Sequence, residues 1–172
     1  VNISLSNQSE GFSITGGASA DSIIGGSGND TINGFVGGGT ITGGGGTDTL
    51  VLTATSSDLN NASDAQLVTV EAISASGATS GVIITLTNQL DGSEGFSITG
   101  SASADSLTGG AGHDTFVGFA GADTVAGGIG TDIIVLSATS ATLNSAADGA
   151  ISGVEAISAS GASIGVNISL FN

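Results

Sequence analysis

The sequence GGAGHDTFV at Gly109–Val117 decides the fold, because the chain contains eight units of this nine-residue pattern. Each unit opens with Gly and has an apolar residue at its eighth position, and seven of the eight carry Asp at the sixth. The units form two blocks of four, GGASADSII, GGSGNDTIN, GFVGGGTIT and GGGGTDTLV from Gly16, and GSASADSLT, GGAGHDTFV, GFAGADTVA and GGIGTDIIV from Gly100. Repetition in phase at a fixed short period predicts a repeat architecture, in which each unit packs against its neighbours.

The residue types in each unit are those of a calcium-binding turn followed by a short strand. Glycines permit a tight turn with closely approaching carbonyls, and the Asp adds an anionic oxygen. Calcium takes six to eight such oxygens at about 2.3–2.6 Å. The last three positions suffice for one short strand that buries a single apolar side chain. We therefore expect Ca²⁺ as the cofactor. The predicted ligands are the sixth-position aspartates Asp21, Asp30, Asp48, Asp105, Asp114, Asp123 and Asp132.

Two units would form one coil of a solenoid, so each ion would lie between a turn and the turn two units later. Complete G-G-x-G-x-D units predict the strongest sites, and the other pairings lack turn glycines or one carboxylate. In order of expected strength, the pairs are Asp30/Asp48 and Asp114/Asp132, then Asp105/Asp123, and finally Asp21/Gly39.

The pattern G-G-x-G-x-D-x-U-x resembles the RTX (hemolysin-type calcium-binding) repeat family, as found in secreted bacterial surface-layer, fibre and adhesin proteins. The resemblance implies an all-β chain folded as a right-handed parallel β-roll or β-solenoid, with calcium held between successive turns on each side. It also implies a secreted, extracellular or cell-surface location.

The charge of the chain supports a cation as partner. There are 15 acidic residues, no Lys or Arg and one His, for a net charge of −15. Stacked carboxylates repel one another, and no basic side chain can neutralise them. The same charge argues against nucleic acid and anionic membrane surfaces as partners. No apolar run approaches the roughly 20 residues of a membrane span, so we expect no membrane insertion. Without Cys, no disulfide holds the chain.

A longer repeat encloses the short one. Phe12–Gly81 realigns on Phe96–Gly165 without a gap, and both contain VEAISASGA. We predict one continuous rod made of repeat 1 (1–81), repeat 2 (82–165) and the start of a third (166–172). At about 4.8 Å per coil, one repeat would rise roughly 19–24 Å. Uncapped solenoid ends favour head-to-tail self-association or continuation into further repeats.

The spacer between the blocks also has the pattern of a solenoid. Val70–Ala75 and Val82–Thr87 are rich in β-branched or alternating residues and predict strands. Ser56–Leu67 suits either a short helix, with Ser57 as a possible N-cap, or a loop.

Catalytic residues are scarce, and we expect no enzyme. His113 occupies the variable fifth position of a unit and is interpreted as a turn residue. The acids outside the sixth positions are interpreted as surface charges: Glu10, Asp58, Asp64, Glu71, Asp91, Glu94, Asp148 and Glu155. Glu71 and Glu155 recur in one strand motif, and contact with an ion or a neighbour is the less favoured alternative for them.

Three functions fit these features. The favoured one is a calcium-binding structural repeat of a secreted, extracellular filament, surface layer or matrix protein, in which calcium drives folding and rigidity. The alternatives are a spacer module of a large cell-surface adhesin and a secretion-assisting tail of a secreted enzyme.

Overall fold

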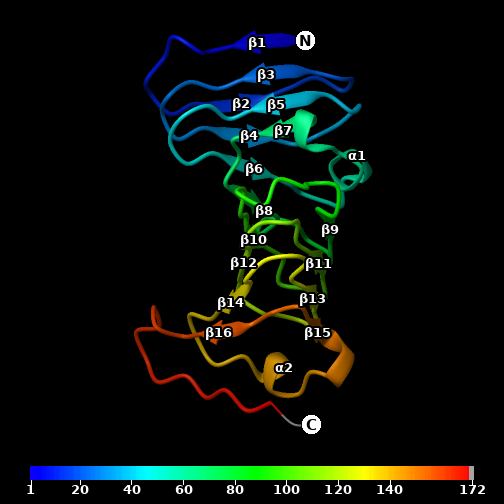
Figure 1. Cartoon of the computed structure of the whole chain (residues 1–172), viewed down its shortest axis with the longest axis vertical. Helices are drawn as coiled ribbons and strands as arrows, with labels where there is room; N and C mark the ends of the chain where they lie inside the picture. Colours follow the sequence, from blue (N-terminus) through cyan, green and yellow to red (C-terminus); the bar gives the residue numbers. More distant parts are fainter. Residues whose placement is uncertain (171–172) are drawn as a thin grey trace.

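In the computed structural model, which describes residues 1–170, the chain winds through successive two-stranded coils (Figure 1). Most strands have three residues, because a nine-residue unit leaves only three positions after its turn. The first four coils contain β1 Asn2–Ser4, β2 Ser13–Thr15, β3 Ser22–Ile24, β4 Thr31–Asn33, β5 Thr40–Thr42, β6 Thr49–Val51, β7 Leu67–Val68 and β8 Ala72–Ser74. The next four contain β9 Ile83–Thr85, β10 Ser97–Thr99, β11 Ser106–Thr108, β12 Thr115–Val117, β13 Thr124–Ala126, β14 Ile133–Val135, β15 Ile151–Ser152 and β16 Ala156–Ser158.

The strands form parallel sheets on two faces of the coil. All even-numbered strands form one 8-stranded sheet from β2 to β16, and each pairs with the strand two places along the chain. The odd-numbered strands form two 4-stranded sheets, β1-β3-β5-β7 and β9-β11-β13-β15. The predicted all-β, parallel β-solenoid is therefore confirmed. Four coils correspond to each predicted long repeat.

The core is a column of apolar side chains inside the coils. The parallel register places Ile32 beside Leu50 and Leu50 beside Ile73. All eight eighth-position side chains are at most 4% exposed, and burying one such side chain contributes about 1.5–3 kcal/mol. Phe35 and Phe119, which interrupt the glycine pattern, are also buried and fill the interior.

The spacers contain the only helical turns in residues 1–170. They are α1 Ser57–Asn60, the 3₁₀ turn η1 Asp64–Gln66, α2 Ala141–Asn144 and the 3₁₀ turn η2 Asp148–Ala150. Of the two alternatives for Ser56–Leu67, the structure has the short helix, but the expected N-cap is wrong by one residue. Ser56 is the N-cap, and its Oγ accepts the Leu59 amide at 3.1 Å. A tertiary contact selects Ser56, because its hydroxyl also donates to the Phe35 carbonyl at 2.6 Å.

Helix α1 replaces a strand at the junction between the two odd-numbered sheets. β7 and β9 do not pair, and the Asn60 side chain occupies the edge of β9 instead. Its amide donates to the Ile83 carbonyl at 3.1 Å and accepts the Thr85 amide at 2.9 Å. Thr55 Oγ1 accepts the Ile83 amide at 2.8 Å. The join between repeats is thus held by side chains as well as by the continuous 8-stranded sheet.

The coils stack along the long axis of the molecule, with the first strand and the segment after β16 at opposite ends (Figure 1). Residues 159–170, after β16, contain no strand. Phe171 and Asn172, which end the predicted third repeat start, lie outside the described residues. No helix within residues 1–170 has the length and apolar character needed to cross a membrane.

Candidate metal-binding turns

The predicted aspartates lie in two rows of turns. The first row joins each odd-numbered strand to the next even-numbered strand and carries Asp30, Asp48, Asp114 and Asp132. The second row joins even-numbered strands to odd-numbered ones and carries Asp21, Asp105 and Asp123. Every one of these aspartates immediately precedes a strand, so the parallel register stacks the carboxylates of one row.

The first row is a ladder of carboxylates and amides. Asp30 Oδ1 accepts the Phe12 amide at 2.8 Å, and Asp48 Oδ1 accepts the Asp30 amide at 2.7 Å. Within its own turn, Asp30 Oδ2 accepts the Gly26 amide at 2.8 Å. The same bonds recur in repeat 2 at 2.7–2.8 Å, among Phe96, Gly110, Asp114 and Asp132. The structure therefore brings together both strongest predicted pairs.

In the second row, repeat 2 contains a third pair. Asp123 Oδ1 accepts the Asp105 amide at 2.9 Å, and Asp105 Oδ1 accepts the Val82 amide at 2.8 Å. Ser101, which replaces a turn glycine, donates its amide and its hydroxyl to Asp105, both at 2.8 Å. The substitution therefore leaves the carboxylate fixed in place.

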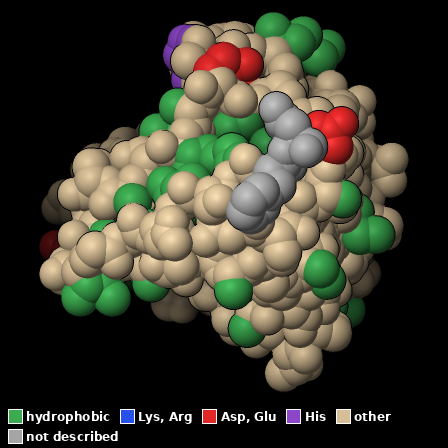
Figure 2. All heavy atoms as spheres, turned by 90° about the horizontal axis from the view of Figure 1, so that it is seen from below, with side chains coloured by type: hydrophobic (Ala, Val, Ile, Leu, Met, Phe, Trp, Pro, Cys, Tyr) green, Lys and Arg blue, Asp and Glu red, His purple; other side chains and the backbone are tan. Residues whose placement is uncertain are grey.

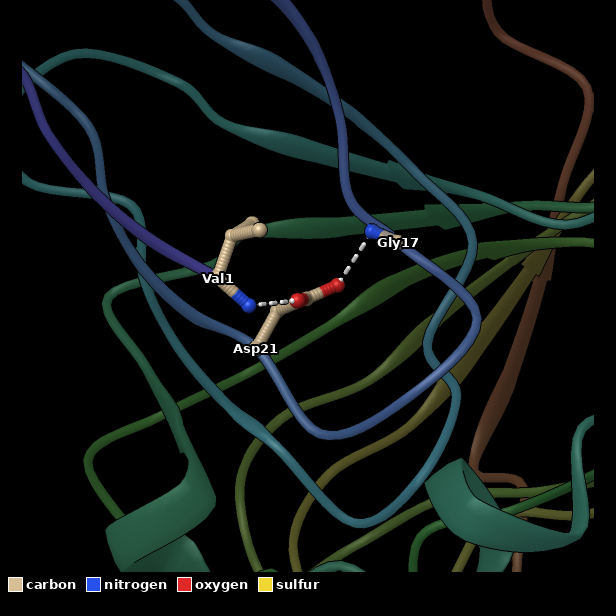
Figure 3. Close-up of polar contacts among 3 residues, drawn as sticks. All are labelled: Val1, Gly17 and Asp21. Carbon is tan, nitrogen blue, oxygen red and sulfur yellow. Dashed lines mark hydrogen bonds and ion pairs between the residues drawn. The ribbon is translucent and has the colours of Figure 1, made fainter.

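Within residues 1–170, Asp21 of repeat 1 has no carboxylate partner. Gly39 lies beside it in the next coil, where the Asp21 carbonyl accepts the Thr40 amide at 2.8 Å. The Val1 amino group donates to Asp21 Oδ1 at 2.5 Å, and the Gly17 amide donates to Oδ2 at 2.6 Å (Figure 3). This ammonium contact lowers the pKa of Asp21. Val1 thus occupies the place that Val82 takes beside Asp105.

At six of the eight first positions, glycine is required by the crowding of oxygens; at the other two, Gly34 and Gly118, nothing lies within 4 Å and φ is positive. A Cβ added at Gly25 would lie 2.0 Å from the Gly43 carbonyl oxygen and 2.3 Å from Asp30 Oδ2. At Gly109, the corresponding distances to the Gly127 carbonyl oxygen and Asp114 Oδ2 are 2.1 and 2.2 Å. Carbonyl and carboxylate oxygens from successive coils therefore converge on the same point, which is the donor chemistry that calcium selects.

The buried carboxylates lack neutralising cations within residues 1–170. Burial raises the pKa of Asp48, Asp114, Asp123 and Asp132, and amide hydrogen bonds offset only part of that effect. Neighbouring carboxylates raise these pKa values further. The apo ladder is therefore electrostatically unfavourable at neutral pH, and a divalent cation would relieve it.

The carboxylates are spread one to a turn. No three His, Asp or Glu side chains of residues 1–170 gather as a ready-made metal cluster. An ion at these turns would therefore draw on backbone carbonyls as well as on the paired aspartates. The residues fit calcium, which accepts mixed carboxylate and carbonyl ligation.

His113 has a backbone-binding role in the same row. Its Nδ1 accepts the Thr131 amide at 2.7 Å, and Asn29 Oδ1 accepts the Thr47 amide at 2.9 Å at the matching position of repeat 1. The interpretation of His113 as a turn residue agrees with this contact.

Sequence reasoning missed that Glu71 and Glu155 belong to the first row. Glu71 Oε2 accepts the Asp48 amide at 2.7 Å, and Glu155 Oε2 accepts the Asp132 amide at 2.7 Å. The available signal was their position directly before β8 and β16, which matches that of Asp48 before β6. The spacing hid it, because these steps are 23 residues instead of 18.

The molecule is a β-solenoid of parallel coils whose turns carry stacked, hydrogen-bonded carboxylates, the type of oxygen ligand that calcium selects. A family model described as the RTX calcium-binding nonapeptide repeat matches four copies, over residues 13–37, 40–53 and 99–134. The predicted resemblance to this family is confirmed, and the matched segments are RTX calcium-binding nonapeptide repeats. No curated protein and no solved structure matches it significantly.

Proposed function

We propose that the chain is a calcium-binding structural module of a secreted, extracellular filament, surface layer or matrix protein. Calcium bound at the turns drives folding and stiffens the rod, and copies of the repeat follow one another end to end. No catalytic role is assigned. The observation that carries the proposal concerns the joint between repeats 1 and 2, which is the set of contacts that Asn60 and Thr55 make with β9. The same contacts recur at the C-terminal end.

The rebuilt joint involves α2 and residues 166–170. Asn144 donates to the Asn167 carbonyl at 3.0 Å and accepts the Ser169 amide at 2.8 Å. Thr139 Oγ1 accepts the Asn167 amide at 3.0 Å. Asn60 and Thr55 make the same contacts with β9 at the equivalent positions of the internal joint. These contacts support a further repeat that starts on α2 in the way that repeat 2 starts on α1.

The apolar positions of that joint lie open at the C-terminal end. At the internal joint, Ala62, Leu67, Val70, Ile73 and Leu86 are all at most 6% exposed. Their counterparts in repeat 2 form a depression of about 210 Å³ instead, and Figure 2 shows hydrophobic side chains gathered at this end. It is lined by Ala146, Ala147, Asp148, Ile151, Val154, Ile157 and Leu170.

The N-terminal end offers the complementary surface. Ile3 and Leu5 are only partly buried, whereas their counterparts Ile84 and Leu86 are at most 1% exposed. Gln8 is exposed, whereas its counterpart Gln89 is buried and donates to the Ala62 carbonyl at 2.8 Å. The occupant that fits the C-terminal depression is therefore the first coil of another copy of this repeat.

Calcium-driven folding is tested by circular dichroism. Metal ligands that cluster only in the folded state make binding part of the folding free energy. We expect a largely disordered spectrum in chelator and a strand-rich spectrum in millimolar calcium, with magnesium as the matched control ion. A strand-rich spectrum that survives verified removal of calcium would contradict the proposal.

The structural role is tested by electron microscopy of the native material in calcium. Uniform filaments or sheets with an axial period of roughly 19 Å, as expected for four coils at about 4.8 Å each, support it. The adhesin-spacer and secretion-tail alternatives predict isolated rods on a larger protein. The duplicated long repeat and the two complementary ends favour the filament or layer.

A further inference from the structure

The first row of turns continues beyond the nonapeptides. After Asp30 and Asp48, its next carboxylate is Glu71, which accepts the Asp48 amide at the same 2.7 Å that separates Asp48 from the Asp30 amide. In repeat 2, Glu155 follows Asp132 in the same way. Both glutamates lie outside the segments that match the nonapeptide family model.

The last aspartate of each nonapeptide block has an unpaired buried oxygen. Asp48 and Asp132 are 0% exposed, and the Oδ2 atom of each has no hydrogen-bond partner among residues 1–170. In repeat 1, the amide of Gly44 donates to Thr69 Oγ1 at 2.9 Å instead. In each of the other sixth-position aspartates, Oδ2 accepts a hydrogen bond from a backbone amide of its own turn. These aspartates are Asp21, Asp30, Asp105, Asp114 and Asp123.

A backbone carbonyl oxygen approaches the same point as each unpaired oxygen. A Cβ at Gly43 would lie 2.4 Å from Asp48 Oδ2 and 2.0 Å from the Thr69 carbonyl oxygen. In repeat 2, a Cβ at Gly127 would lie 2.4 Å from Asp132 Oδ2 and 1.6 Å from the Gly153 carbonyl oxygen. Within residues 1–170, neither oxygen of either pair accepts a hydrogen bond, which is costly unless a cation or water lies between the two oxygens.

The turns that carry Glu71 and Glu155 have a backbone conformation that places the Thr69 and Gly153 carbonyls at these points. Thr69 has φ 48°, the only positive φ of a non-glycine residue in 1–170, and its counterpart Gly153 has φ 57°. The left-handed residue lets the short turn between β7 and β8 replace the longer turn of a nonapeptide. The longer side chain of Glu71 then reaches the Asp48 amide from this shorter turn. Its other carboxylate oxygen accepts no hydrogen bond from residues 1–170.

We propose that Glu71 and Glu155 each complete a calcium site that is not of the nonapeptide type. The first site takes Asp48 Oδ2, the Thr69 carbonyl and the Glu71 carboxylate. The second takes Asp132 Oδ2, the Gly153 carbonyl and the Glu155 carboxylate. The inference rests on the proposed calcium-binding function. The two sites add one ion to the first row in each repeat, at the coil that follows the nonapeptide block. With these ions, no buried carboxylate of the row remains unpaired.

Native mass spectrometry of the full chain in excess calcium tests the sites by counting ions. The variants are Glu71→Gln, Glu155→Gln and their combination, with Glu10→Gln as a control that removes an equal charge from an exposed side chain. We expect each single variant to bind one ion fewer than the wild type, the double variant two fewer, and the control none fewer. An unchanged count in the double variant would overturn the proposal while leaving calcium binding at the nonapeptides intact.

Crystals of the wild-type chain grown with europium(III), a luminescent calcium substitute, provide a measurement that does not depend on a variant folding. Anomalous density between Asp48 Oδ2 and Glu71 supports the site. Density at the Asp30/Asp48 and Asp114/Asp132 turns with only water beside Glu71 and Glu155 overturns it. An absence of ions from every turn would instead contradict the proposed function on which the inference rests.

Discussion

At the scale of single residues, the turns tolerate little change because side-chain and backbone oxygens of successive coils meet there. Asp30 is an example, since its two carboxylate oxygens accept the Phe12 amide of the preceding coil and the Gly26 amide of its own turn. Its own amide is held by Asp48 of the next coil. Each sixth-position aspartate is therefore a structural link between coils as well as a candidate ligand.

The first-position glycines that face these oxygens should also be sensitive to substitution. In Gly109→Ala, the new methyl group would lie 2.1 Å from the Gly127 carbonyl oxygen and 2.2 Å from Asp114 Oδ2. We expect a loss of about 1–3 kcal/mol in unfolding free energy in saturating calcium, as for overpacked cores. Urea denaturation followed by circular dichroism measures it. Gly149→Ala, where nothing lies within 4 Å, is the control; equal losses in the two variants would contradict the account.

At the scale of elements, the stacked carboxylates give the apo and calcium-bound chains opposite responses to pH. Burial raises the pKa of Asp48, Asp114, Asp123 and Asp132, so these four carboxylates bind more protons in the apo fold than in the unfolded chain. The apo fold should therefore gain stability as pH falls through the raised pKa values toward the ordinary value of 3.8. With calcium, protons compete with the ion, and stability should fall over the same range.

Strand content measured by circular dichroism between pH 7 and pH 4, with chelator and with calcium, checks these signs. A rise in strand content on acidification without calcium and a fall with it are the expected results. Parallel pH profiles in the two conditions would show that the ladder does not bind the ion.

The Asn60 bridge is the element-scale link between the two repeats. Asn60→Ala would leave the Ile83 carbonyl and the Thr85 amide without their side-chain partner. We expect a loss of about 1–3 kcal/mol in unfolding free energy, smaller if water replaces the amide. Asn61→Ala is the matched control, because the Asn61 side chain donates only to Ser57 of its own helix. Hydrogen exchange at Thr85 should accelerate in Asn60→Ala alone.

The nonapeptide period was sufficient to predict the solenoid, the pairing of turns two units apart and the buried eighth position, because each depends on contacts within a fixed short spacing. The spacer was predicted less well. The N-cap is Ser56 and not Ser57, because a contact with the Phe35 carbonyl selects it. Glu71 belongs to the first row through a turn that is shorter than a nonapeptide turn, and the nine-residue period does not predict that length. Side-chain bridges such as that of Asn60 depend on a neighbour in another repeat, which the local sequence does not contain.

At the scale of the whole molecule, the two ends are complementary and also compete. Val1–Leu5 and Val166–Leu170 have the same sequence, VNISL. Residues 166–170 already lie on α2, held by Asn144 and Thr139. In separate molecules, the first coil of one copy can therefore reach α2 of the next only by displacing an identical tethered segment. Tethering gives such a segment an effective concentration of order millimolar.

Removing residues 166–172 should consequently promote end-to-end association. The truncated chain exposes Asn144, Thr139 and the apolar depression lined by Ile151 and Val154, and the first coil of another copy can bind there unopposed. We expect association in calcium at protein concentrations at least about tenfold lower than for the full chain, since the millimolar competitor is gone. Sedimentation velocity across a concentration series measures it. Asn144→Ala in the truncated chain should weaken the association, because the edge of the incoming strand loses both amide contacts. If truncation leaves the chain monomeric at every concentration, end-to-end stacking of separate copies is ruled out, and the repeats must follow one another within a single chain.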